Sequence, residues 1–161
     1  MRGEYPETVI EVIDSRMRFR PATLRAVRAF SLCKPWSGSL EKRKEKFVKV
    51  NYDLAEAYSI PAPELRFQQM DGSSSGGSHY LPTANCIVLS GRLSVVTYLH
   101  EFAHALGKDE TDACRWSINL FRRCFPRQFA RLLHKGHMLI RPSDVARDLA
   151  IPDSKMDRKT S

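Results

Sequence analysis

Three features that mark membrane, secreted and zinc-ribbon proteins are missing from this chain of 161 residues. No run of eighteen apolar residues occurs, which excludes a conventional membrane-spanning helix. The segment Met1–Pro6 lacks the apolar stretch that a secretory signal needs. No C-x-x-C spacing is present, so a cysteine zinc ribbon is excluded as well. We therefore expect a cytoplasmic protein without membrane contact, whose reduced cysteines are small core residues: Cys33, Cys86, Cys114 and Cys124.

Acidic residues are in short supply relative to basic ones. The chain has 26 Lys and Arg against 18 Asp and Glu, which gives a net charge of +8 and a pI near 9.6. This excess is consistent with nucleic acid as a partner that binds the basic N-terminal region. The alternative is a solvated basic face that only aids solubility. No helix-turn-helix or aromatic-interleaved pattern decides between them. The early basic residues are Arg16, Arg18, Arg20, Arg25, Arg28, Lys34, Lys42, Arg43, Lys44 and Lys46.

The length predicts one domain over residues 1–161, because 161 residues can bury a single sizeable core. Within it we distinguish a basic helical N-terminal extension (1–38), a catalytic core (39–136) and a C-terminal helix with a polar tail (137–161). Helical spacing of apolar residues, Ser caps and Gly or Pro stops predict six helices. They run from Pro21 to Leu32, Ser39 to Tyr58, Ser94 to Leu106, Asp109 toward Pro126, Pro126 to Lys135, and Ser143 to Ala150.

Two segments have residue patterns typical of β-strands. Residues Glu64–Met70 alternate between apolar and polar, and Thr83–Ser90 contain a continuous apolar run. Between them, Asp71–Ser78 is rich in Gly and Ser and is predicted to be a loop. Helices followed by strands and then by helices indicate an α+β domain with a small sheet rather than a βαβ fold.

The segment that begins at His100 carries the clearest chemical signal. His100 and His104 are four residues apart inside a predicted helix, so their imidazoles lie one turn apart on one face and can bind one metal ion. Glu101 follows the first histidine, and its carboxylate is placed to accept a proton without being a ligand. This H-E-x-x-H pattern predicts a Zn²⁺ site with Glu101 as the catalytic base.

A catalytic zinc usually has a third protein ligand and an open fourth position. Glu110 lies six residues after His104, and Gly107 between them permits a sharp backbone turn. We therefore predict Glu110 as the third ligand. Asp109 and Asp112 are alternatives, because acidic residues at a helix start are favourable without any metal.

The full string from His100 to Glu110 satisfies H-E-x-x-H-x-x-G-x-x-E and resembles the zincin metallopeptidases. Its spacing is similar to that of the metzincins, with Glu110 where their third histidine stands. The segment Glu110–Trp116 resembles the E-x-x-A region of minimal gluzincins and ImmA/IrrE-type peptidases, and the two upstream strands are similar to those of SprT-like domains. The resemblance implies a zincin-like domain in which a short sheet packs against the motif helix.

This resemblance also implies a reaction. Zinc would lower the pKa of its bound water, and Glu101 would take the proton as the water attacks a peptide bond of an intracellular protein. We expect the substrate to bind as an added strand if Thr83–Leu89 forms an exposed sheet edge. Two rivals remain: a nucleic-acid-associated protein, and a zinc-stabilised scaffold without turnover. A further oxyanion donor is unassigned among His79, Tyr80, His134 and His137.

Overall fold

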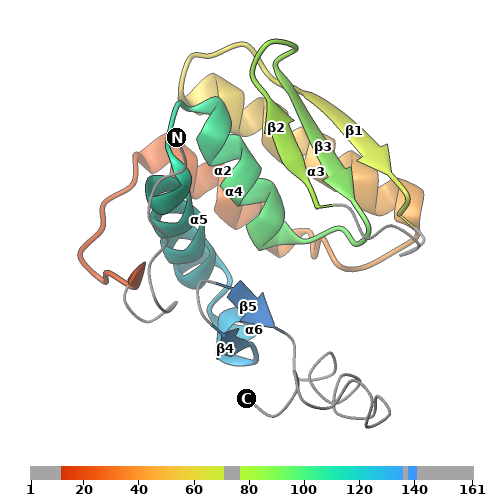
Figure 1. Cartoon of the computed structure of the whole chain (residues 1–161). Coiled ribbons are helices and arrows are strands. Elements are labelled where there is room, and N and C mark those ends of the chain that lie inside the picture. Colours follow the sequence, from red (N-terminus) through yellow and green to blue (C-terminus); the bar gives the residue numbers. More distant parts are fainter. Residues whose placement is uncertain (1–11, 71–76, 136–137, 141–161) are drawn as a thin grey trace, which may run out of the picture.

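The computed structural model describes residues 12–70, 77–135 and 138–140, and within them the protein is an α+β domain (Figure 1). Helices come first, a three-stranded sheet follows, and further helices and a small two-stranded sheet complete the chain. The predicted fold class is thereby confirmed. The elements are α2 (Pro21–Leu32), α3 (Leu40–Ala57), β1 (Glu64–Gln68), β2 (His79–Leu81), β3 (Cys86–Ser90), α4 (Val95–Ala105), α5 (Glu110–Cys124), α6 (Pro126–Ala130), β4 (Leu133–Lys135) and β5 (Met138–Ile140).

Side-chain caps set the starts of the three longer helices after α2. The Ser39 side chain accepts a hydrogen bond from the Lys42 backbone N–H, and Ser94 does the same for Thr97. Asp109 caps α5 by accepting from the Asp112 backbone N–H at 2.8 Å. Each cap satisfies one N–H that a helix start leaves without a partner, which is why these boundaries can be predicted from sequence.

Strand β3 is the centre of the three-stranded sheet, which has the order β1-β3-β2. It pairs in parallel with β1 and antiparallel with β2. The prediction that Thr83–Leu89 forms an exposed edge is therefore wrong. The physical reason is that His79–Leu81, for which no strand was predicted, adds as a third strand and occupies that edge. The edge nearest the motif helix is β2 (Figure 1).

One buried cluster joins the elements and extends from Val12 to Phe129. Its centre is aromatic: Phe102 of α4 is fully buried and stacks on Trp116 of α5, with ring centroids 6.1 Å apart. Truncating a buried Phe to Ala typically costs about 3–5 kcal/mol, so this contact is a major support of the motif helix. Four aromatics of α5, α6 and their junction also pack in this core, since all are at most 9% exposed: Trp116, Phe121, Phe125 and Phe129.

The end of the described chain differs from the sequence prediction. A helix was expected to continue to Lys135, but α6 ends at Ala130 and β4 pairs with β5. A short apolar run fits a helix or a strand equally well, and here the pairing partner downstream decides. The helix expected over Ser143–Ala150 lies outside the described residues. Across the described ranges, no helix is long and apolar enough to span a bilayer.

Candidate metal centre

Helix α4 places His100 and His104 on one face, as four-residue spacing requires. Their ring centroids are 4.8 Å apart and their Nε2 atoms are 3.2 Å apart. Both side chains are only about one fifth exposed. The opposite face of α4 holds Leu99, Phe102 and Ala103, which are fully buried in the core. The apolar face therefore fixes the rotation of the helix, and the two imidazoles point into a shallow, partly covered site.

A tight turn brings the next helix back to these imidazoles. Gly107 has a φ of +90°, a conformation that a side chain would strain. Its turn ends α4 and lets α5 start at Glu110. The carboxylate of Asp109 is occupied as the N-cap of α5, and Asp112 is exposed on the same turn. Of the three acidic candidates, the structure therefore brings Glu110 to the histidines.

Two imidazole nitrogens and the two oxygens of one carboxylate converge at this point. The Glu110 carboxylate oxygens lie 2.8 Å from His104 Nε2 and 3.2 Å from His100 Nε2. In a tetrahedral zinc site with bonds of about 2.0–2.1 Å, ligand atoms are about 3.3 Å apart. The two separations of 3.2 Å are close to that value, and the one of 2.8 Å between His104 and Glu110 is shorter. Two imidazole nitrogens and a carboxylate also form a donor set of catalytic zinc sites that leave a fourth position open.

The outer nitrogens of both rings have partners that help to orient the inner ones. His104 Nδ1 lies 2.8 Å from the Lys108 carbonyl oxygen, so Nδ1 is the donor and Nε2 keeps its lone pair for the site. His100 Nδ1 lies 3.8 Å from Cys114 Sγ. Such contacts behind metal-binding histidines fix tautomer and ring orientation. His104 Nε2 and the Glu110 carboxylate are then both electron-rich at 2.8 Å, and a cation between them, either a metal ion or a proton, would remove their repulsion.

Cys114 is the residue at this site that sequence reasoning missed. Its thiol, His100 and Glu110 offer ligand atoms within 4.8 Å of one another, so a second metal-binding group can be drawn. However, the thiol contacts the Nδ1 side of His100, whereas His104 and Glu110 face its Nε2 side. One imidazole presents only one nitrogen to one ion, so the two groups exclude each other. The four-residue spacing of Glu110 and Cys114 on α5 was the available signal.

Glu101 follows His100 on α4 and is 7% exposed. Burial raises the pKa of its carboxyl to about 7, against smaller opposing effects of His104 and of a hydrogen bond from the Tyr80 backbone N–H. A divalent cation held by the neighbouring ligands would favour the carboxylate and lower this pKa again. The Tyr80 contact also shows that the edge strand β2 touches the predicted base.

The structure narrows the earlier candidates for a further oxyanion donor. The Tyr80 hydroxyl donates to the Asn85 side chain at 2.8 Å, and the His79 ring is exposed and next to the Gly77 carbonyl. The side chain of His134 and all of His137 lie outside the described part of the chain. No oxyanion donor is therefore assigned.

No protein-family model, no curated protein and no solved structure matches this chain. The likeness to zincins consequently depends on the residues from His100 to Trp116 and on the geometry around them.

Proposed function

We propose that this chain is a zinc-dependent metallopeptidase that hydrolyses peptide bonds of a cytoplasmic protein. The observation that carries the proposal is the convergence of His100, His104 and Glu110 on one point, with separations of 2.8–3.2 Å between their ligand atoms. The buried Glu101 beside them supplies the second element that this chemistry needs, a general base.

Each residue has a separate task in the proposed reaction. His100, His104 and Glu110 would hold the metal, which when bound makes a water acidic and polarises a carbonyl group. Glu101 accepts a proton from the attacking water and returns it to the leaving amine. The hydrogen bond from the Tyr80 backbone N–H would hold the Glu101 carboxylate in place. The Lys108 carbonyl and the Cys114 thiol hold the two imidazoles from behind.

The substrate we propose is an extended peptide segment that lies along β2. This strand is the edge of the sheet next to α4, and backbone groups at a strand edge can pair with an added strand. Such binding would bring a peptide bond past Glu101, which Tyr80 already contacts. Cysteines without disulfides at all four positions suit the reducing cytoplasm that we propose for both protein and substrate.

Metal analysis and one substitution test this function. The purified protein should contain about one zinc per chain and hydrolyse fluorescein-labelled casein. Glu101→Gln should retain the metal and lose hydrolysis, because an amide cannot accept the proton. Asp112→Ala is the matched control, since Asp112 is an exposed acid two residues from Glu110, and it should keep both properties.

Two other outcomes would replace the proposal. A protein that holds zinc and loses stability when the metal is removed, but hydrolyses nothing before or after Glu101→Gln, would be a zinc-stabilised scaffold. A folded protein that binds no divalent metal would leave His100, His104 and Glu110 as a proton-bridged cluster.

A further inference from the structure

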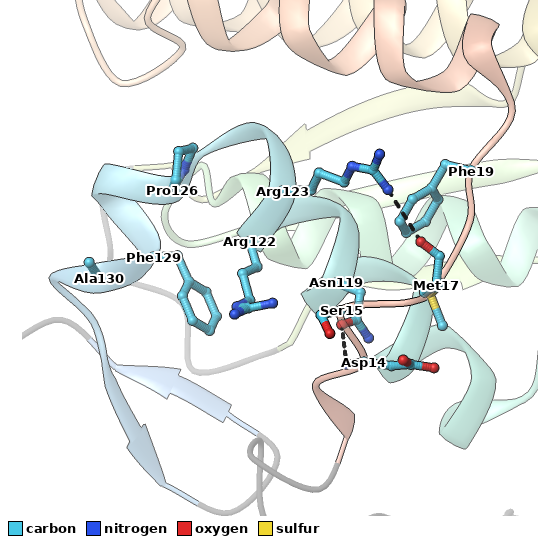
Figure 2. A pocket seen from close by; sticks show the side chains of 10 residues that line it. All are labelled: Asp14, Ser15, Met17, Phe19, Asn119, Arg122, Arg123, Pro126, Phe129 and Ala130. Atoms are coloured by element: carbon cyan, nitrogen blue, oxygen red, sulfur yellow. Dashed lines mark hydrogen bonds between the residues drawn. The ribbon is translucent and has the colours of Figure 1, made fainter.

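A second hollow lies at the other end of α5, away from the metal centre. It is a cleft of about 490 Å³ between the segment 14–19 and the junction of α5 with α6. Figure 2 shows Arg122 of α5 between Phe129 of α6 and the N-terminal segment. The cleft is lined by Asp14, Ser15, Met17, Phe19, Asn119, Arg122, Arg123, Pro126, Phe129 and Ala130.

Asn119 holds the N-terminal wall of this cleft in place. Its buried side chain accepts a hydrogen bond from the Asp14 backbone N–H at 2.7 Å and donates one to the Val12 carbonyl at 2.7 Å. Arg123 adds a hydrogen bond to the Met17 carbonyl at 3.3 Å. Three hydrogen bonds between residues more than one hundred positions apart therefore fix this wall. The cleft is thus part of the folded structure.

In the described segments that line the cleft, the positive charge comes from arginine alone. Within 14–19 and 119–131, the described residues include one acid, Asp14, whose carboxylate accepts a hydrogen bond from the Arg16 backbone N–H. By contrast, most cations of α3 are lysines. Guanidinium groups bind phosphates through two parallel hydrogen bonds and stack on planar rings, which ammonium groups do not. Six exposed arginines belong to the two segments: Arg16, Arg18, Arg122, Arg123, Arg127 and Arg131.

Apolar walls complete the cleft beside these cations. Phe19 is partly buried and packs edge-on against Trp116, and Phe129 is 9% exposed. The two rings lie on opposite sides of the cleft, with Arg122 and Asn119 between them (Figure 2), so the apolar lining is in two places and forms no open stacking platform. An anion that carries a planar, partly apolar group matches such a cleft, and a nucleotide unit has that composition. A duplex keeps its bases stacked inside, whereas a single strand can place a base against the apolar lining of the cleft and its phosphates on the arginines.

We infer that this cleft binds single-stranded nucleic acid, with Arg122 on a phosphate and a base against the apolar part of the lining next to it. The net charge of +8 favours the approach of a polyanion. About twelve residues of α5 separate Glu110 from Arg122, which corresponds to about 18 Å. Binding of a nucleic-acid strand in the cleft is thus a second function beside the proposed peptidase activity. It would hold the metal centre close to proteins bound on the same nucleic-acid strand.

Arg122 is the residue that tests this inference. Among the described residues its guanidinium makes no hydrogen bond or ion pair, and the side chain is exposed. Fluorescence anisotropy with a labelled oligothymidylate of about 15 nucleotides should give a Kd that rises steeply between about 50 and 200 mM salt. Arg122→Ala should weaken binding about tenfold and lower the slope of log K against log salt by about 0.7, the share of one phosphate.

Matched variants separate the cleft from general basicity. Lys42→Ala removes an exposed cation of α3 and should leave both affinity and slope unchanged. Arg122→Lys keeps the charge and should fall between the wild type and Arg122→Ala, because the planar fork is lost. Arg122 also lies in the last turn of α5, where a cation stabilises the helix. Thermal unfolding must therefore show each variant folded at the assay temperature, and Arg122→Lys remains informative if Arg122→Ala is not.

Three results would overturn the inference. The wild type could fail to bind the oligonucleotide at low salt, or both Arg122 variants could bind as tightly as Lys42→Ala does. Polyglutamate could also compete as well as oligothymidylate at equal charge, which would make the cleft a site for acidic peptides. Glu101→Gln should bind the strand like the wild type, so failure of the proposed peptidase leaves this test unaffected.

Discussion

The two ends of helix α5 carry opposite charge and were visible to very different degrees in the sequence. At its start, Glu110 meets His100 and His104, and all three residues fall within eleven positions of the chain. At its end, Arg122 faces a wall built from residues 14–19, more than one hundred positions away. The comparison teaches that a site formed by local spacing can be recognised in advance, whereas a site formed by docking of a distant segment cannot.

Substitution of Glu110 should produce the largest effect, and this effect should be confined to the metal centre at the start of α5. Glu110→Ala removes one of three converging ligand atoms and should weaken zinc binding more than 100-fold, measured by competition with a chromophoric chelator. Arg122→Ala, at the far end of the same helix, should leave the zinc affinity unchanged. If Asp112→Ala weakens zinc binding as much as Glu110→Ala does, the ligand assignment at the start of α5 is wrong.

In the metal-free protein, the free energy of unfolding should depend on pH because of the buried Glu101 carboxyl. Burial raises the pKa of Glu101 from 4.5 to about 7 in the folded protein, so the folded state holds this proton more tightly than the unfolded chain does. Stability from this group is full below about pH 4.5 and is lost as the pH rises toward 7. In urea unfolding with a chelator present, Glu101→Gln should therefore be more stable than the wild type by about 1–3 kcal/mol at pH 8.

The same pair should be nearly equal in stability at pH 4, because both side chains are then neutral. A stability difference of the same size at both pH values would contradict an effect of ionisation.

Asn119→Ala should disturb the arginine cleft at the end of α5 and leave the metal centre at its start unchanged. Loss of its side chain leaves the Asp14 N–H and the Val12 carbonyl without their partners, which should lower the free energy of unfolding by about 1–3 kcal/mol. Oligothymidylate binding should weaken because the N-terminal wall loosens, while zinc affinity in the folded protein should not change. Equal losses at both ends would show that the two sites are coupled through α5.

Cys114→Ser should have the smallest effect, since we place this thiol behind His100 rather than on the metal. Zinc affinity should fall by about tenfold, the lower range for such supporting contacts. In cobalt-substituted protein, no sulfur-to-metal charge-transfer absorption should be present in the wild type. Cys124→Ser serves as the control. Cys124 is also a buried thiol of α5, and burial raises its pKa to about 11. A charge-transfer band that disappears in Cys114→Ser would make the thiol a ligand.

The sequence by itself determined the helices that have local start and stop signals. Ser39, Ser94 and Asp109 cap their own helices, and Gly107 turns the chain between α4 and α5. It also determined that His100 and His104 share one helix face, because this follows from a spacing of four residues. These features depend on neighbours within one or two turns, and a single sequence contains all of that information.

Only the tertiary structure decided the remaining features, because each depends on residues far apart in the chain. The choice of Glu110 over Asp109 and Asp112 required the packing angle of α5 against α4 and the use of Asp109 as a cap. The edge position of β2 depended on which strand pairs with β3. The arginine cleft required Asn119 to hold a segment 105 residues away, a contact that no periodicity or local motif encodes.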